Sequence, residues 1–75
     1  MDSKYMVAYK MPEPPGTKYK MWEIHSKRGD DLLGWIQYYE PWKEFVFSPE
    51  TSTIFSTGCL QDIITFIDQI KDDKK

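Results

Sequence analysis

The chain has 75 residues, one cysteine and 16% aromatic residues, and it carries a formal net charge of −2. This length fits one small domain and excludes two separate cores, while the single cysteine excludes a disulfide scaffold. The negative charge argues against a general binder of nucleic acid or anionic membranes, because neutralising phosphates needs a surplus of lysine and arginine.

Residues 5–11 form the first predicted element, an edge strand, because they are mostly apolar and compatible with an extended backbone. Residues 12–16, Pro-Glu-Pro-Pro-Gly, end this strand, since proline lacks a backbone donor and has a fixed φ angle. We therefore expect a single domain in four parts: an N-terminal arm or edge strand with a proline-rich loop (1–17), a β-meander (18–56), a helix (57–71) and a frayed tail (72–75).

The middle of the chain predicts further strands joined by turns. Residues 18–26 alternate, which places Trp22 and Ile24 on one side of a strand. The β-favouring side chains that follow predict strands over residues 32–39, 42–48 and 53–55. Turns are expected at residues 27–31, at Pro41 and at residues 49–51.

An amphipathic helix ends the predicted order of elements, with Ser56 or Thr57 as its N-cap. Its apolar stripe repeats at three- and four-residue spacing and consists of Leu60, Ile63, Ile64, Ile67 and Ile70. The predicted fold class is therefore α+β: an antiparallel meander of three to four strands with one C-terminal helix packed on one face.

The two hairpins predict which side chains share a face of the sheet, because paired residues point to the same side. A first hairpin centred on Gly29 pairs Trp22 with Ile36. A second hairpin with a loop over residues 39–42 pairs Ile36 with Phe45 and Trp35 with Val46. The face expected under the helix then carries Trp22, Ile24, Ile36, Phe45 and Phe47.

The opposite face is too aromatic for a plain solvated surface, and such a patch often marks an interaction site or a subunit interface. We expect the partner-binding residues to be Trp35, Tyr39 and Trp42 as anchors, Val46 and Met21 between them, and Glu23, Glu44 and His25 as a polar rim. The open alternative is that the N-terminal strand or the proline-rich segment folds across this face and completes its burial.

Two functions remain open for this face. The preferred hypothesis is a protein-interaction module that binds a protein partner or a second copy of the chain as a homodimer. The alternative is single-stranded nucleic-acid binding, with Trp35, Tyr39 and Trp42 as stacking platforms. The lysine and arginine side chains that could contact phosphates are Lys18, Lys20, Lys27, Arg28 and Lys43. Glu23 and Glu44 on the same face would repel a phosphate backbone, and we therefore disfavour this alternative.

Catalysis, metal binding and cofactor binding find little support in the sequence. Cys59 and His25 are the one pair that suggests a nucleophile with a base, but packing explains the cysteine and surface pairing explains the histidine equally well. One cysteine and one histidine cannot supply the four usual ligands of a zinc ion. We expect no enzyme activity, no metal and no cofactor.

The location of the protein is predicted from what the sequence lacks. No apolar run approaches the roughly 20 residues that span a bilayer, and the N-terminus has no apolar stretch typical of a signal peptide. We therefore expect a cytoplasmic protein with no membrane partner. One unpaired cysteine agrees with a reducing compartment.

Four segments between about residues 20 and 70 carry a resemblance to known proteins. They are Trp22-Glu23-Ile24, Leu33-Gly34-Trp35-Ile36, Trp42 with Phe45-Val46-Phe47-Ser48-Pro49, and Cys59-Leu60-Gln61-Asp62-Ile63 with Phe66-Ile67. In these segments the chain resembles small uncharacterised proteins of bacteria and phages. The resemblance implies a meander followed by a helix, and it implies no activity or site.

Overall fold

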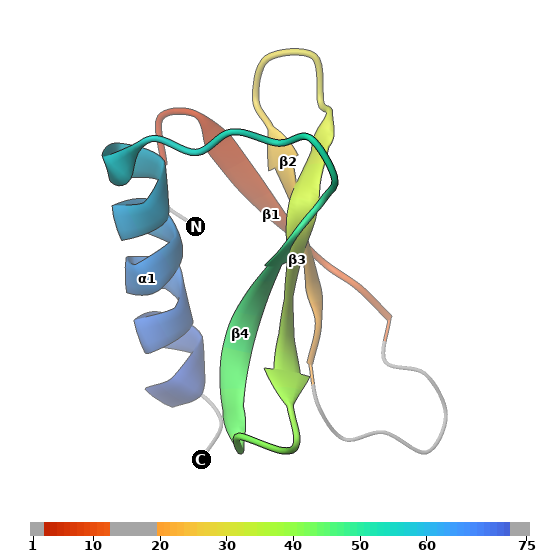
Figure 1. The fold of residues 1–75 in the computed structure, drawn as a ribbon, viewed down its shortest axis with the longest axis vertical. Coiled ribbons are helices and arrows are strands. Elements are labelled where there is room, and N and C mark those ends of the chain that lie inside the picture. Colours follow the sequence, from red (N-terminus) through yellow and green to blue (C-terminus); the bar gives the residue numbers. More distant parts are fainter. Residues whose placement is uncertain (1–2, 13–19, 73–75) are drawn as a thin grey trace.

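The structure, a computed structural model, describes residues 3–12 and 20–72. Four antiparallel strands form one sheet in the order of the chain, and a single helix follows them (Figure 1). The elements are β1 (Met6–Lys10), β2 (Trp22–Ser26), β3 (Leu32–Tyr39), β4 (Glu44–Pro49) and α1 (Thr57–Asp72). The helix runs along one face of the sheet, which confirms the predicted α+β meander with a C-terminal helix.

Most predicted strands are confirmed, with one exception. β1 is the edge strand, and it lies beside β2 in the sheet instead of crossing the aromatic face. The strand predicted over residues 53–55 is wrong, because this segment is the link that leaves the sheet at β4 and reaches the start of α1 (Figure 1). The predictions for residues 13–19 and 73–75, which include most of the proline-rich loop and the tail, lie outside the described residues.

The β2–β3 hairpin has the predicted register, with Trp22 opposite Ile36. The pairing shifts after Ile24, where a β-bulge lies between that residue and its successor. Gly34 is opposite Ile24 and Leu32 is opposite His25, so the additional residue is in β3. A bulge of this kind bends the strand locally and increases its twist.

The β3–β4 hairpin differs from its predicted register by two residues. Ile36 is opposite Phe47 instead of Phe45, and Trp35 is opposite Ser48 instead of Val46. The loop lies one residue later than expected, over residues 40–43. A shift of two residues leaves every side chain on its predicted face, because strand side chains alternate with a period of two.

The helix begins as predicted, but it is rotated about its axis. Ser56 is the N-cap, since its hydroxyl accepts a hydrogen bond from the Cys59 amide at 3.2 Å. Leu60 and Ile64, which were expected to cover the sheet, are 45% and 51% exposed. Phe66, missing from the predicted stripe, is buried instead.

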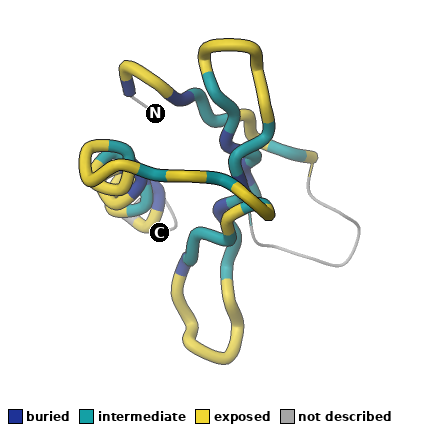
Figure 2. Tube along the Cα trace, turned by 45° about the horizontal axis from the view of Figure 1, so that its top comes forward, coloured by how far each residue is buried: buried dark blue, intermediate teal, exposed yellow. Residues whose placement is uncertain are grey.

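The core lies between α1 and the face of the sheet that it covers, which we call the inner face (Figure 2). The Phe66 ring contacts the Trp22 ring edge to face, with 5.6 Å between the ring centroids. The buried apolar residues are Met6, Trp22, Ile24, Ile36, Phe45, Ile63, Phe66 and Ile70. Phe47 packs against them half-buried, so the predicted inner face is confirmed.

Gly34 allows β3 and β4 to pack closely on the inner face. A Cβ atom at this position would lie 2.5 Å from the Ser48 carbonyl oxygen and 2.8 Å from the Phe47 ring. The Phe47 ring therefore occupies the space that any other residue at position 34 would need.

Ser3 ties the start of the described chain to the helix. Its hydroxyl donates to the Asp62 carboxylate of α1 at 2.9 Å and accepts from the Met6 amide at 3.2 Å. The Lys27 amine donates to the Ser3 carbonyl at 2.6 Å, which adds a contact to the β2–β3 turn. These bonds fasten the helix to the β1 side of the sheet.

Candidate interaction surface

The face of the sheet opposite α1, which we call the outer face, follows from strand alternation. Because Ile24, Ile36 and Phe45 point into the core, their neighbours along each strand point outward. The outer face consists of Val7 and Tyr9 from β1, Glu23 and His25 from β2, Trp35, Gln37 and Tyr39 from β3, and Glu44, Val46 and Ser48 from β4.

The predicted interface residues fall on this face or beside it. Six of them are strand residues of the outer face: Glu23, His25, Trp35, Tyr39, Glu44 and Val46. Met21 comes directly before β2, and its carbonyl accepts a hydrogen bond from the Met11 amide at 2.8 Å. Trp42 is in the β3–β4 turn. Strand alternation therefore places the predicted residues on or beside one face, although their binding role stays a prediction.

Trp35 occupies a central position, with a polar neighbour on each side. Glu23 is opposite it on β2 and Ser48 is opposite it on β4. The Ser48 hydroxyl accepts a hydrogen bond from the Gln37 amide group at 3.2 Å. Glu23 also pairs with Tyr9 of β1, so this carboxylate lies between two aromatic rings instead of at the rim.

Tyr39 and Trp42 form the most exposed aromatic pair. Their rings meet edge to face, with centroids 5.0 Å apart and planes at 87°. The exposed fractions are 41% for Tyr39 and 65% for Trp42. The turn is tight, because the Trp42 amide donates to the Tyr39 carbonyl at 3.2 Å and Lys43 has a φ of 54°. The pair thus lies at one end of the outer face, where the tight turn brings the two rings into contact.

The sequence analysis missed Val7 and Tyr9, which extend the outer face onto β1. Val7 is opposite His25, and Tyr9 is opposite Glu23. The alternation of Met6 and Ala8 with Val7 and Tyr9 was the signal that would have found them.

His25 is the centre of a polar cluster at the β2–β3 end of the outer face. Its Nε2 lies 2.9 Å from the Glu23 carboxylate, and its Nδ1 lies 3.1 Å from the Asp30 carbonyl oxygen. The hydrogen bond to Glu23 is the main cause that raises the pKa of His25, with a smaller contribution from Asp30. The predicted pair-forming role of this histidine is confirmed.

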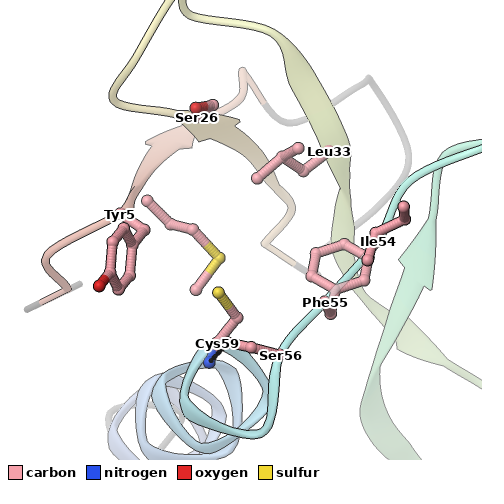
Figure 3. Close-up of a pocket in the computed structure, with 8 residues that line it drawn as sticks. Tyr5, Ser26, Leu33, Ile54, Phe55, Ser56 and Cys59 are labelled. Atoms are coloured by element: carbon pink, nitrogen blue, oxygen red, sulfur yellow. Dashed lines mark hydrogen bonds between the residues drawn. The ribbon is translucent and has the colours of Figure 1, made fainter.

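A separate pocket opens on the helix side of the sheet, with a volume of about 500 Å³ (Figure 3). Cys59 points its sulfur into it from the first turn of α1, while Leu33 and Phe55 line the other side. Ile54 lines the pocket although 93% of its surface is exposed. Cys59 and His25 lie on opposite sides of the sheet, so the structure does not bring this predicted pair together.

Within the described residues, the side chains that could bind a metal ion and those that could contact phosphates do not gather at one place. No group of three or more His, Cys, Asp or Glu side chains in residues 3–12 and 20–72 is placed to hold a metal ion. Lys27 and Arg28 are in the β2–β3 turn, at the other end of β3 from Trp42 and Lys43. Lys20 precedes β2 and is half-buried, and Lys18 lies outside the described residues.

Comparison with known proteins finds a relative of this chain among phage proteins. No family model and no solved structure matches it. Within the described residues, no helix is long and apolar enough to cross a bilayer. An uncharacterised 9.3 kDa protein of Acholeplasma phage L2 is 30% identical over 61 residues, which are 81% of this chain and 78% of the phage protein. This match confirms the predicted resemblance, and the chain belongs to the family of that phage protein.

Proposed function

We propose that the protein is a non-catalytic interaction module that binds a second copy of itself or another protein through its outer face. The observation that carries this proposal is the position of Trp35, Tyr39 and Trp42 on the side of the sheet that α1 leaves uncovered. Tryptophan and tyrosine are the residues most enriched in binding hot spots, because they bury a large area with few rotatable bonds.

Binding would work by removing water from the aromatic rings. Trp42 and Tyr39 are exposed enough to enter a pocket on a partner, and Val46 fills the space beside Gln37. Polar groups close to the rings, such as Glu23, would set the orientation of the partner and add less to the affinity.

The first experiment compares the mass of the wild-type chain in solution with that of Trp42→Ala, by light scattering behind a sizing column. Self-association through the outer face predicts a wild-type dimer that Trp42→Ala shifts toward the monomer. Leu60→Ala is the matched control, because it removes an exposed apolar side chain from α1. The ring of Trp42 is largely exposed and packs against Tyr39 at the end of β3, so the free energy of unfolding should fall by about 1 kcal/mol or less.

The outcomes separate two forms of the proposal. A dimer that Leu60→Ala disrupts and Trp42→Ala does not would assign self-association to the helix and would contradict the outer-face proposal. A monomeric wild-type chain would remove the second copy as partner and leave binding to another protein, for which Trp35→Ala is the test variant. Trp35→Ala must keep the far-UV circular dichroism of the fold, since a residue on the outer face is outside the core.

Single-stranded nucleic acid is the second candidate, favoured by Lys43 next to Trp42 in the β3–β4 turn. Glu44 follows directly and faces Tyr39, which weakens this reading. Titration of a fluorescent oligonucleotide at low and high salt separates the candidates, because phosphate contacts weaken steeply with salt. Absence of oligonucleotide binding at low salt would end this candidate.

A further inference from the structure

His25 connects three segments of the chain at the β2–β3 end of the outer face. From β2, Glu23 lies 2.9 Å from Nε2; from the β2–β3 turn, the Asp30 carbonyl lies 3.1 Å from Nδ1, and the Asp30 carboxylate lies 3.4 Å from it. From β1, the Tyr9 ring packs edge-on against the imidazole, with 5.0 Å between the centroids. The Tyr9 hydroxyl also donates to Asp30 at 3.4 Å. β3 places Leu32, which is uncharged, opposite the histidine.

Both ring nitrogens of His25 face groups that only accept hydrogen bonds. A carboxylate and a backbone carbonyl have no proton to donate, and each bond therefore needs an N–H on the histidine. The imidazolium has two such protons, whereas the neutral ring has one. Loss of the proton thus leaves one nitrogen lone pair facing an acceptor, and one of the two bonds must break. The Glu23 carboxylate is charged and is therefore the stronger acceptor, so the neutral ring keeps its proton on Nε2 and the Nδ1 bond to the Asp30 carbonyl is the one that breaks.

The turn that receives one of these bonds has an unusual backbone. Gly29 and Asp30 follow each other with φ angles of 81° and 59°, a conformation that costs an aspartate some strain and needs support from its surroundings. Other bonds also hold the turn: the Ser26 amide donates to the Asp31 carbonyl at 2.8 Å, and the Arg28 amide donates to the Ser26 hydroxyl at 3.1 Å. Unlike these two bonds, the Nδ1 bond depends on whether the His25 ring carries its second proton.

We propose that Glu23, His25 and Asp30 form a proton-dependent clasp, which holds the β2–β3 turn against the outer face when His25 is charged and releases it when the proton is lost. The clasp is independent of the proposed function, since it concerns the turn and not a partner. It joins the sheet to a hairpin loop in which Lys27 and Arg28 lie beside Asp30 and Asp31.

The direction of the effect follows from the titration of the folded and unfolded chains. In the folded chain the pKa of His25 is raised above its ordinary value of 6.5 by the bonds to Glu23 and Asp30. The clasp therefore contributes its full stability below pH 6.5, and this contribution is lost as the pH rises through the raised pKa. Low pH closes the clasp.

The test follows the ring and the turn by NMR in the full chain between pH 5 and pH 9. The ¹⁵N shifts of the His25 ring should show two protonated nitrogens at low pH and a midpoint above 6.5. Over the same range, the hydrogen-exchange protection factors of the Ser26 and Arg28 amides should fall, because the released turn opens more often. A wild-type midpoint at or below 6.5, or protection that does not change through the midpoint, would overturn the proposal.

Two variants make the test specific. Glu23→Gln keeps an oxygen that can accept from Nε2 but removes the charge, so the His25 midpoint should move down toward 6.5. Asp31→Asn is the matched control: it removes a neighbouring acid that makes no contact with the ring in the structure, and it should leave the midpoint in place. An unchanged midpoint in Glu23→Gln would also overturn the proposal. The wild-type titration alone decides the case if a variant fails to fold.

Discussion

The two faces of this small sheet are built from the same strands and differ in almost every other respect. On the inner face, Ile24 and Ile36 have no exposed surface, and aliphatic and aromatic side chains interlock with α1. On the outer face, aromatic rings alternate with Glu23, Gln37 and Ser48, and several polar atoms are paired. One helix can cover only one face, so the buried core that stabilises the fold lies on the inner face, and the outer face is the one for which we propose a role in recognition.

The largest change in stability is expected from a pair of side-chain truncations, one on each face of the sheet. Ile36→Ala should reduce the free energy of unfolding by about 2–5 kcal/mol, because it opens a cavity in a fully buried site. Val46→Ala on the outer face should cost about 1 kcal/mol or less. Urea denaturation of both variants gives the two values. Equal losses would mean that the outer face is covered and that the division between the faces is wrong.

Gly34→Ala tests how closely β3 and β4 approach on the inner face. The new methyl group would clash with the Ser48 carbonyl and the Phe47 ring, and we expect a loss of about 1–3 kcal/mol. Gly58→Ala in the first turn of α1 is the control, because its Cβ would meet only Ser56 Oγ at 3.8 Å. That control should gain up to about 1 kcal/mol through helix propensity. A neutral Gly34→Ala would show that both the Phe47 ring and the Ser48 backbone can shift to admit the methyl group.

Ser3→Ala sharpens the comparison on the side of the helix. It removes the bond to Asp62 and leaves the Met6 amide without its partner, which should cost about 1 kcal/mol. Asp62→Asn should cost less, because the amide oxygen can still accept from the Ser3 hydroxyl. Thermal unfolding measures both changes. If Ser3→Ala leaves the unfolding temperature unchanged, the bonds between Ser3 and α1 do not stabilise the packing of the helix on the inner face.

Much of this arrangement was predictable from the sequence because strand parity is robust. The assignments of Trp35 to the outer face and Ile36 to the inner face hold even though the β3–β4 register was predicted two residues off. Such a shift preserves both faces, so hydrophobic pattern alone cannot detect it. The position of the tight turn sets the β3–β4 register. The positive φ of Lys43 belongs to this turn, and no signal in the sequence indicated it.

The remaining errors concern contacts between elements. Residues 53–55 have strand-forming side chains, but a strand needs a partner, and this segment is needed as a link to α1. The apolar stripe of the helix was wider than the surface it covers, so Leu60 and Ile64 are left outside. Phe66 lies three residues after Ile63 and four before Ile70, so the same helical spacing places it on the buried face. The sequence alone does not reveal its partner, the Trp22 ring of β2.

The bulge between β2 and β3 has a consequence for how the strands find one another. A register shift of two residues between β2 and β3 would leave apolar side chains on the inner face and polar ones on the outer face. It would, however, move the bulge away from the position at which Leu33 packs against the core. The extra residue in β3 therefore favours a single register of the β2–β3 hairpin. The β3–β4 pairing has no bulge of this kind. We therefore expect the β2–β3 hairpin to reach its register first during folding, and β4 to pair with β3 afterwards.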